Sequence, residues 1–383
     1  MSKAAQPLAG RKIAHLTTVD MSLEYLLLPQ LCAARDAGAE VIGISAPGSA
    51  VDRLEALGIR HISLDGSTRG MNLLGDLRAV RSLWRILRSE RPDVLHTHNP
   101  KPGVYGRVIG RVAGVPVVVN TVHGLYASPD DRWLRKAVVY SLEAIASRFS
   151  DAELVQNEED LELMRRLHLA PRARLHLLGN GVDLDRFHPS AVAGETRRRI
   201  RAELDVDDAT VLFGVVARLV HEKGYRELIE AAERAGPGAA FVAVGGHDPE
   251  KADTLACDEI ARGEQAGVRF VGHREDVLDL YAAMDVAVLP SYREGLPRSL
   301  MEAAAMAKPL IATNIRGCRQ VVDDGQNGCL VPPRDAKKLT ESIRMLADDR
   351  DRRLAYGARS RAIAEERFDE RTIVAQVLAT YQT

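Results

Sequence analysis

The sequence predicts an α/β protein with two domains, each built on a parallel sheet that helices cover on both faces. Short β-branched segments alternate with helix-length segments from one end of the chain to the other. Such alternation is typical of parallel sheets, whose strands are joined by helical crossovers. A length of 383 residues exceeds what one compact core usually accommodates, so we expect two domains of ordinary size.

Twelve segments are expected to be strands because they are short, rich in β-branched residues and bounded by turn residues. They span residues 12–19, 40–47, 60–65, 93–99, 115–123, 152–157 and 174–180, and then 209–218, 239–246, 268–273, 286–291 and 309–314. A turn signal and a proline within 180–190 separate the two groups. We therefore expect an N-terminal domain over residues 1–187, a second domain over 188–360, and a C-terminal helix over 361–383 that crosses back to the first.

The composition is that of a globular protein that does not span a bilayer. Hydrophobic residues make up 46% and charged residues 27% of the chain. No uninterrupted apolar run approaches the ~20 residues of a membrane-spanning helix. The first residues lack the long apolar segment of a secretory signal, so a cytoplasmic location is expected. The four cysteines have no C-x-x-C spacing, which argues against a metal knuckle and a disulfide framework.

Basic residues are concentrated in the first half of the chain. The totals nearly balance, with 52 Lys and Arg against 53 Asp and Glu, but residues 69–148 hold 13 basic and 6 acidic side chains. Residues 77–92 and 131–149 mix tryptophan, leucine and arginine in the pattern of helices that lie on an anionic membrane. A basic helix that covers the sheet with its apolar side explains the same pattern equally well. The anionic membrane surface is therefore one of two interpretations.

Several familiar motifs are missing from the sequence. No G-x-G-x-x-G follows the first predicted strand, which disfavours a dehydrogenase. A G-x-S-x-G elbow and a Walker loop are also missing, which removes the commonest hydrolase and P-loop interpretations. In two parallel-sheet domains, the ligand is expected where loops at the carboxyl ends of the strands face each other across a cleft.

Two glutamates stand out in the segment SYREGLPRSLMEAAAMA. Glu294 lies in the exit loop of the predicted strand 286–291, and a helix is expected to begin near Pro297. Glu302 then lies inside an otherwise apolar helix, where a carboxylate is costly unless it is paired or hydrogen-bonded. The hydroxyls of a ribose are suitable donors. The alternative is an ordinary glutamate on a solvent-facing stripe.

Arg218 and Lys223 follow the first predicted strand of the second domain, in the segment VARLVHEKG. Two cations in such a loop can neutralise a diphosphate, as the departure of a nucleoside diphosphate requires, and a metal ion is then not necessarily needed. A solvated basic loop explains the pair equally well. Gly295 and Leu296 lie where the helix carrying Glu302 begins, so their backbone N–H groups are candidates for binding the same phosphates.

His123 directly follows a predicted strand of the first domain. It is a candidate for acid–base chemistry, for contact with a sugar hydroxyl or for electrostatic assistance, although a lone histidine is more often structural. His96 and His98 form an H-x-H pattern that resembles a metal pair, but no further ligand is apparent near them. We interpret them, with Lys101, as strand-end packing and loop-ordering residues and expect no metal site.

Five motifs in order resemble those of the retaining, nucleotide-sugar-dependent glycosyltransferases of family 4. They are TVHG, NGVD, VARLVHEKG, DLYAAMDVAVLPS and the E-x-x-x-x-x-x-x-E of Glu294 and Glu302. The resemblance covers nearly the whole chain. It implies the GT-B fold, in which two Rossmann-like domains face a central cleft and the C-terminal helix packs back across the boundary. The donor would then bind to the second domain and the acceptor to the first.

The resemblance also implies roles for single residues. Glu302 would hold the ribose of the donor, and Glu294 would contact the donor sugar and its phosphate end. Arg218 and Lys223 would bind the diphosphate, while His123 would face the transferred sugar. The catalytic set is then His123, Glu294, Arg218 and Lys223, with no cofactor and no metal.

The finer pattern of these segments looks like that of bacterial enzymes that extend surface polysaccharide or glycolipid on a lipid carrier. This likeness implies a UDP-sugar donor and a lipid-linked saccharide or similar glycan acceptor. A peripheral position on the inner face of the cell membrane stays one of two interpretations of the basic helices, and no nucleic acid is expected as a partner.

Three positions depart from the family pattern. Residues 20–22 replace a glycine-rich loop, and Gln320 replaces a frequent glutamate. Ala307 replaces a glycine after the motif helix, where a left-handed cap costs an alanine about 1 kcal/mol.

Two rival functions stay open. A sugar-nucleotide epimerase of the same architecture would form product without an acceptor, and a non-catalytic relative would bind nucleotide-sugar or a protein partner without turnover.

Overall fold

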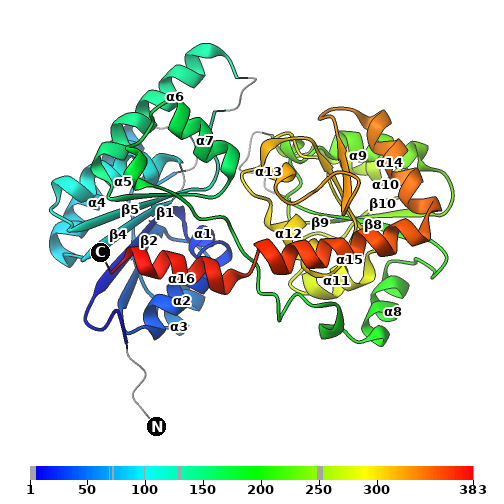
Figure 1. Cartoon of the computed structure of the whole chain (residues 1–383), viewed down its shortest axis with the longest axis horizontal. Helices are drawn as coiled ribbons and strands as arrows, with labels where there is room; N and C mark the ends of the chain where they lie inside the picture. Colours follow the sequence, from blue (N-terminus) through cyan, green and yellow to red (C-terminus); the bar gives the residue numbers. More distant parts are fainter. Residues whose placement is uncertain are drawn as a thin grey trace, which may run out of the picture. The chain divides into compact units, whose positions relative to one another are not determined.

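The protein is described here by a computed structural model that covers residues 6–68, 70, 73–98, 100–127, 131–247 and 253–382. The chain divides into two compact units (Figure 1). Unit 1 comprises Met1–Gly179 with Arg371–Thr383, and unit 2 comprises Asn180–Glu370. Each unit has a parallel sheet with helices on both faces, which confirms the predicted fold class.

Unit 1 contains a seven-stranded parallel sheet in the order β3-β2-β1-β4-β5-β6-β7. Its strands are β1 (Lys12–Val19), β2 (Glu40–Ala46), β3 (Arg60–Ser63), β4 (Val94–His98), β5 (Val117–Val122), β6 (Ala152–Val155) and β7 (Leu175–Leu177). All seven coincide with predicted segments; Asn99, at the end of one such segment, lies outside the described residues. The order reverses between β1 and β4, so the carboxyl ends of these neighbours form the switch point where ligands bind in open α/β sheets.

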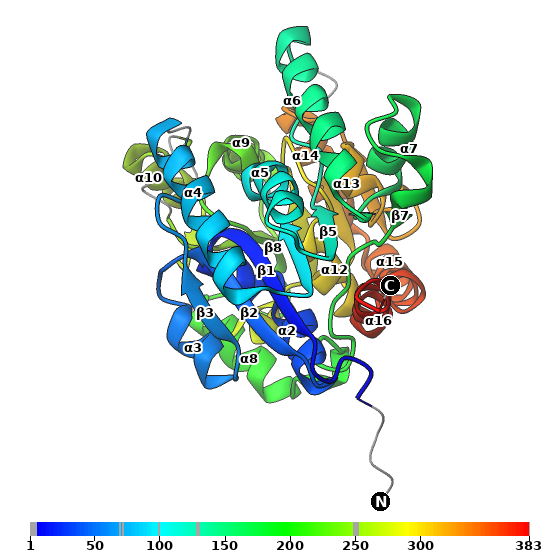
Figure 2. The same cartoon turned by 90° about the vertical axis from the view of Figure 1, so that its left-hand side faces the viewer.

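Helices cover both faces of this sheet. They are α1 (Asp20–Tyr25), α2 (Leu28–Asp36), α3 (Val51–Ala56), α4 (Leu73–Glu90), α5 (Pro100–Val112), α6 (Trp133–Ala146), η1 (Ser147–Phe149), α7 (Glu158–Arg166), η2 (Arg172–Arg174) and α16 (Glu370–Thr380). On one face, Ile13 of β1 packs with residues of α1, α2, α3 and α16. On the other face, its neighbour Ala14 packs with residues of α4. Figures 1 and 2 show the red helix α16 beside the blue elements of unit 1, although it ends the chain.

Unit 2 contains a six-stranded parallel sheet in the order β10-β9-β8-β11-β12-β13. Its strands are β8 (Val211–Val216), β9 (Ala239–Val244), β10 (Val268–Phe270), β11 (Val286–Leu289), β12 (Leu310–Thr313) and β13 (Gly328–Val331). The sequence predicted the first five and missed β13, because this four-residue strand begins with glycine and has little β-branched character. It lies at the edge of the sheet, beside β12.

The helices of unit 2 also form two layers. They are η3 (Pro189–Ala191), α8 (Gly194–Glu203), η4 (His221–Lys223), α9 (Tyr225–Ala235), α10 (Cys257–Gln265), α11 (Val277–Ala283), α12 (Arg298–Ala305), α13 (Arg316–Arg319), α14 (Ala336–Asp348) and α15 (Arg350–Arg367). Side chains of α8, α11, α12 and α15 form the core on one face of the sheet, and those of α9 and α14 form the core on the other. None of the described helices of either unit is long and apolar enough to cross a bilayer.

The chain changes unit after Gly179 and again after Glu370, whereas the boundaries expected from the sequence lie at 187/188 and 360/361. Residues 180–187 fall in unit 2 because Val182 and Phe187 are buried in its core. Helix α15 continues past residue 360 because its later residues, such as Ile363, are buried in the same core. The helix that packs in unit 1 is α16.

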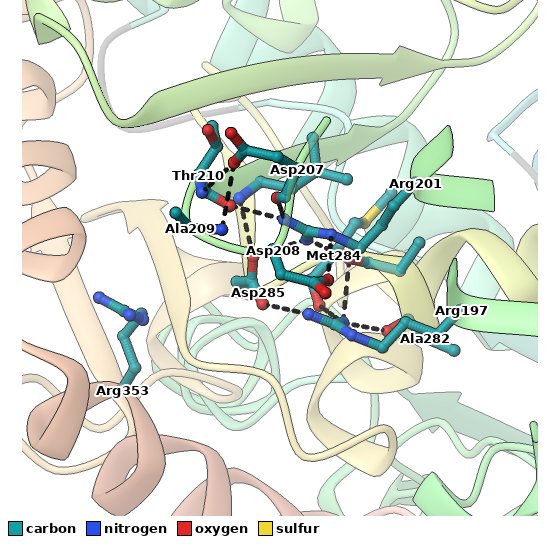
Figure 3. Close-up of polar contacts among 12 residues, drawn as sticks. Arg197, Arg201, Asp207, Asp208, Ala209, Thr210, Ala282, Met284, Asp285 and Arg353 are labelled. Atoms are coloured by element: carbon teal, nitrogen blue, oxygen red, sulfur yellow. Dashed lines mark hydrogen bonds and ion pairs between the residues drawn. The ribbon is translucent and has the colours of Figure 1, made fainter. Parts of the chain in front are cut away.

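A polar cluster joins the amino-terminal ends of β8 and β11 (Figure 3). Asp285 directly precedes β11 and accepts hydrogen bonds from Arg197 Nη2 at 2.7 Å, Arg201 Nη1 at 3.0 Å and the backbone N–H of Leu212 at 2.8 Å. Lys308 Nζ donates to the carbonyl of Met284 at 2.8 Å. One carboxylate thus ties α8 to two neighbouring strands.

Candidate active site

The loop after β8 carries both predicted phosphate-binding cations. Arg218 is exposed, and Lys223 is half-buried at the end of η4. The next residue, Gly224, has a left-handed φ of 73°, and a Cβ there would lie 2.0 Å from the carbonyl oxygen of Pro290. Glycine therefore allows this loop to pack directly against the chain that leaves β11. The two loops meet at the carboxyl ends of neighbouring strands, as a ligand site in a parallel sheet requires.

This close approach brings Lys223 to Glu294. Lys223 Nζ donates to Glu294 Oε1 at 2.6 Å, and Ser291 Oγ donates to the same oxygen at 2.7 Å. The side chains of Lys223 and Glu294 are 16% and 12% exposed, so the pair is largely shielded from water. An ammonium group has three N–H donors, so Lys223 keeps capacity for an anion while it holds Glu294.

The segment between Glu294 and α12 is fixed from two sides. A Cβ at Gly317, in α13, would lie 2.5 Å from the carbonyl oxygen of Gly295. The side chain of Leu296 is buried in the core of unit 2. These contacts place the two backbone N–H groups just before α12, where the sequence predicted phosphate contacts. That phosphate role stays a prediction.

Glu302 lies inside α12 and does not face solvent. Its side chain is 13% exposed; Oε1 accepts from Arg298 Nε at 3.0 Å, and Oε2 accepts from the hydroxyl of Tyr281 at 3.2 Å. Burial raises the pKa of Glu302, and the contacts with Arg298 and Tyr281 partly offset this rise. The alternative of a solvent-facing glutamate is therefore wrong. Each carboxylate oxygen has a second lone pair for a hydroxyl group.

His123 belongs to unit 1 and directly follows β5. Its Nε2 lies 3.1 Å from His98 Nδ1, and the side chain of Gln156 also hydrogen-bonds to the ring. Withdrawal of the ring from water lowers the pKa of His123 to about 4. The imidazole is therefore neutral at pH 7, which fits contact with a hydroxyl better than service as a general acid.

The expectation that His96 and His98 have no further ligand nearby is wrong. His15 of β1 lies in register with His96, and ligand nitrogens of the three histidines lie within 4.8 Å of one another. The sequence hid this cluster because β1 and β4 become neighbours only through the order of the sheet. Lys101, which was grouped with them, instead pairs with Asp76 at 2.6 Å.

Three residues that touch the glutamates were missed by the sequence analysis. Ser291 and Tyr281 gave no signal, since neither a serine at a strand end nor an aromatic residue in a helix is unusual. Arg298 did give a sequence signal, because it precedes Glu302 by one helical turn and side chains at i and i+4 meet on a helix.

Comparison with known proteins decides the family. Residues 31–186 match the model described as Glycosyltransferase Family 4, and residues 196–363 match the model described as Glycosyl transferases group 1. An Escherichia coli relative named UDP-Gal:alpha-D-GlcNAc-diphosphoundecaprenol alpha-1,3-galactosyltransferase is 31% identical over 74% of this chain and 73% of its own length. The chain belongs to the family-4 glycosyltransferases.

A second relative of this glycosyltransferase covers almost the whole chain. It is the Campylobacter jejuni protein named N,N'-diacetylbacillosaminyl-diphospho-undecaprenol alpha-1,3-N-acetylgalactosaminyltransferase, which is 26% identical over 97% of this chain and 98% of its own length.

Solved structures agree in fold. Anabaena HepE in complex with UDP superposes with a TM-score of 0.80 at 22% identity, over 97% of this chain and 99% of its own. Sucrose-phosphate synthase from Thermosynechococcus elongatus gives a TM-score of 0.81 at 21% identity, over 97% of this chain and 98% of its own. This glycosyltransferase has the GT-B fold, with two Rossmann-like units.

Proposed function

We propose that this glycosyltransferase moves a sugar from a UDP-sugar to a lipid-linked saccharide, with retention of configuration at the anomeric carbon and without a metal ion. The observation that carries the proposal is the shielded pair of Lys223 and Glu294 at the ends of two neighbouring strands, with Glu302 on the helix that follows. The names of the relatives support the acceptor class, because both specify diphosphoundecaprenol-linked sugars. Both names also specify α linkages, and UDP-galactose is itself an α-glycoside.

The leaving diphosphate gains negative charge as the bond to the sugar breaks. Arg218 and Lys223 stabilise this charge, a role that is strongest in the transition state. Among the described residues, the two side chains that donate to the Glu294 carboxylate both donate to Oε1, so Oε2 accepts a hydroxyl of the donor sugar in this scheme. The two cations then do the work that a divalent ion does elsewhere. The contact of His123, in unit 1, with the transferred sugar stays a prediction of the family resemblance.

The reaction is tested by release of UDP from a panel of UDP-sugars, with and without a lipid extract, in the presence of a chelator. We expect release that depends on lipid and persists with the chelator. Epimerised UDP-sugar formed without lipid would support the epimerase instead. Donor binding without turnover would support the non-catalytic relative, and loss of release with the chelator would contradict the metal-free scheme.

Replacing Glu302 with glutamine is expected to weaken UDP binding about 10- to 100-fold, because a hydrogen bond to a charged group contributes roughly 1.5–3 kcal/mol. Titration calorimetry with UDP measures the effect. The fold should survive, since Arg298 keeps a second partner in Glu370 at 3.4 Å. The matched control is Glu365→Gln, which changes an i,i+4 pair with Arg361 on α15, where the Glu365 side chain is 56% exposed. Equal affinity in parent and Glu302→Gln would refute the ribose contact.

We further propose that helix α6 attaches unit 1 to an anionic membrane. Four of its exposed apolar residues fall on one stripe, and the helix lies within the basic segment 69–148. The stripe comprises Leu134, Val138, Leu142 and Ile145. The opposite face is docked, because the buried Arg107 binds Glu143 of α6 at 2.6 Å and Glu153 at 2.8 Å. The apolar stripe is thus held outward, and its positive surroundings complement anionic headgroups.

Substituting Leu134 or Ile145 with serine is expected to weaken binding to anionic vesicles about 10-fold, because burial of such a side chain contributes roughly 1.5–3 kcal/mol. Vesicle co-sedimentation measures this, and salt should weaken binding in every variant. Leu354→Ser is the control, since Leu354 is 57% exposed on α15 of unit 2. Equal losses in the control and the α6 variants, or equal binding to neutral vesicles, would contradict the attachment through α6.

A further inference from the structure

Four histidines on or next to three neighbouring strands meet inside unit 1. His15 lies on β1, His96 and His98 lie on β4, and His123 follows β5. The first three are fully buried. The strand order places β4 between β1 and β5, so the four rings come together across these three strands. Tyr381, which directly follows α16, is buried with them.

These side chains form one continuous row of hydrogen-bonding atoms. The Tyr381 hydroxyl lies 3.3 Å from His15 Nε2. His15 Nδ1 lies 3.2 Å from His98 Nε2, and His98 Nδ1 lies 3.1 Å from His123 Nε2. On its other side, the Tyr381 hydroxyl lies 2.6 Å from His96 Nδ1. This row of hydrogen-bonding atoms therefore links Tyr381 to His123 through His15 and His98.

The geometry favours a hydrogen-bond chain over a metal site. His96 Nε2 lies 2.8 Å from Thr121 Oγ1, so both nitrogens of His15, His96 and His98 have a protein partner within 3.3 Å. A ligand nitrogen must direct an unshared lone pair at the metal. Here the lone pairs of these three rings are engaged with one another and with hydroxyl groups.

One assignment sets the direction of these hydrogen bonds. In it the Tyr381 hydroxyl donates to His96 Nδ1 across 2.6 Å, a distance within the range of hydroxyl donors. The phenol oxygen then accepts from His15 Nε2–H across 3.3 Å. A neutral imidazole has one N–H, so each ring that donates on one side must accept on the other. His98 Nε2–H therefore donates to His15 Nδ1, and His123 Nε2–H donates to His98 Nδ1.

We propose that Tyr381, His15 and His98 are positioning residues that hold His123 as the neutral Nε2–H tautomer, with Nδ1 left as an acceptor. This hydrogen-bond chain requires neutral imidazole rings, and burial favours the neutral form. It lowers the pKa of His15 to about 3 and takes the pKa values of His96 and His98 well below their ordinary range. One consequence rests on the proposed function: His123 Nδ1 would accept a hydrogen bond from a hydroxyl group of the substrate, and the ring would not give up a proton.

Nitrogen-15 NMR of histidine-labelled protein tests the proposal without substrate. Long-range proton–nitrogen spectra show which ring nitrogen is protonated, and the His123 signals are assigned by their loss in His123→Gln. We expect the single Nε2–H pattern for His123 in the parent. In Tyr381→Phe, which keeps the ring but removes the hydroxyl, we expect the His123 signals to shift toward a mixture of the two tautomers. Tyr105→Phe, which removes a hydroxyl in α5, should leave the pattern unchanged.

Three results would overturn the proposal. They are Nδ1 protonation of His123 in the parent, an unchanged pattern in folded Tyr381→Phe, and a joint shift of His15, His96 and His98 on addition of Zn²⁺ that reverses with chelator. If Tyr381→Phe does not fold, the parent spectrum decides alone. Full transfer activity in His123→Ala would refute a role toward the sugar but would leave the tautomer assignment intact, so the two failures are distinguishable.

Discussion

Replacing Glu294 with alanine is expected to lower kcat for sugar transfer about 10²- to 10³-fold, the usual loss when one preorganised electrostatic contact is removed from an active site. The carboxylate fixes Lys223 Nζ at 2.6 Å, and Lys223 in turn is aimed at the leaving diphosphate in the proposed reaction. The variant loses both the sugar contact and the position of the cation. Steady-state release of UDP with acceptor present measures the loss.

A nearby ion pair provides the control for this substitution. Glu222 pairs with Arg293 at 3.1 Å between the same two loops, with side chains 26% and 32% exposed. Glu222→Ala therefore breaks a comparable contact without touching Lys223, and we expect a small change in kcat. Similar losses in Glu222→Ala and Glu294→Ala would mean that the loops, and not the carboxylate, determine the rate.

Replacing Asp285 with alanine is expected to lower the free energy of unfolding by about 3 kcal/mol or more, because it leaves buried cations without their counter-charge. Arg201 is 2% exposed, and Arg197 and Lys308 lie in the same cluster. Chemical denaturation of parent and variant measures the difference. The substitution acts at the amino-terminal ends of β8 and β11, away from the loops that carry Lys223 and Glu294.

Asp279 provides the control for this substitution, and the pH dependence of stability reports the charge of Asp285. Asp279→Ala removes an exposed pair with Arg199, also on α8, and should cost about 1 kcal/mol or less. Burial alone would raise the pKa of Asp285, but the Leu212 N–H and the arginines outweigh it and lower that pKa. Its stabilisation is thus present at neutral pH and is lost as the pH falls below about 3.8, the ordinary aspartate pKa. A loss of stability that stayed constant into acid, or one matched by Asp279→Ala, would contradict the ionic explanation.

The sequence predicted most of the fold because parallel strands carry a strong local signal. Twelve segments rich in β-branched residues each contain an observed strand. The limits of the units were harder to place, since they depend on which core buries a segment. Residues 180–187 look like a linker but are anchored by Phe187. Helix α15 continues past residue 360, the predicted end of the second domain, because Ile363 is buried in the core of unit 2.

Some residues of the candidate site could be predicted from the sequence, and their partners could not. Glu294, Glu302, Arg218 and Lys223 stand in motifs that the sequence displays, so they were found. The partners were not, because contacts such as that of Tyr281 with Glu302 arise only when separate elements pack. Ala307 shows a further limit: its φ is 54°, so the helix keeps a left-handed end although an alanine occupies it.

The configuration of the product tests the central claim most directly. A UDP-sugar and a saccharide linked to diphosphoundecaprenol are incubated with the parent enzyme, and proton NMR reads the new glycosidic linkage. The account predicts an α linkage from an α-configured donor, formed by the parent and reduced in Glu294→Ala. A β linkage would contradict retention, and an α-linked product formed equally well by Glu294→Ala would contradict the site.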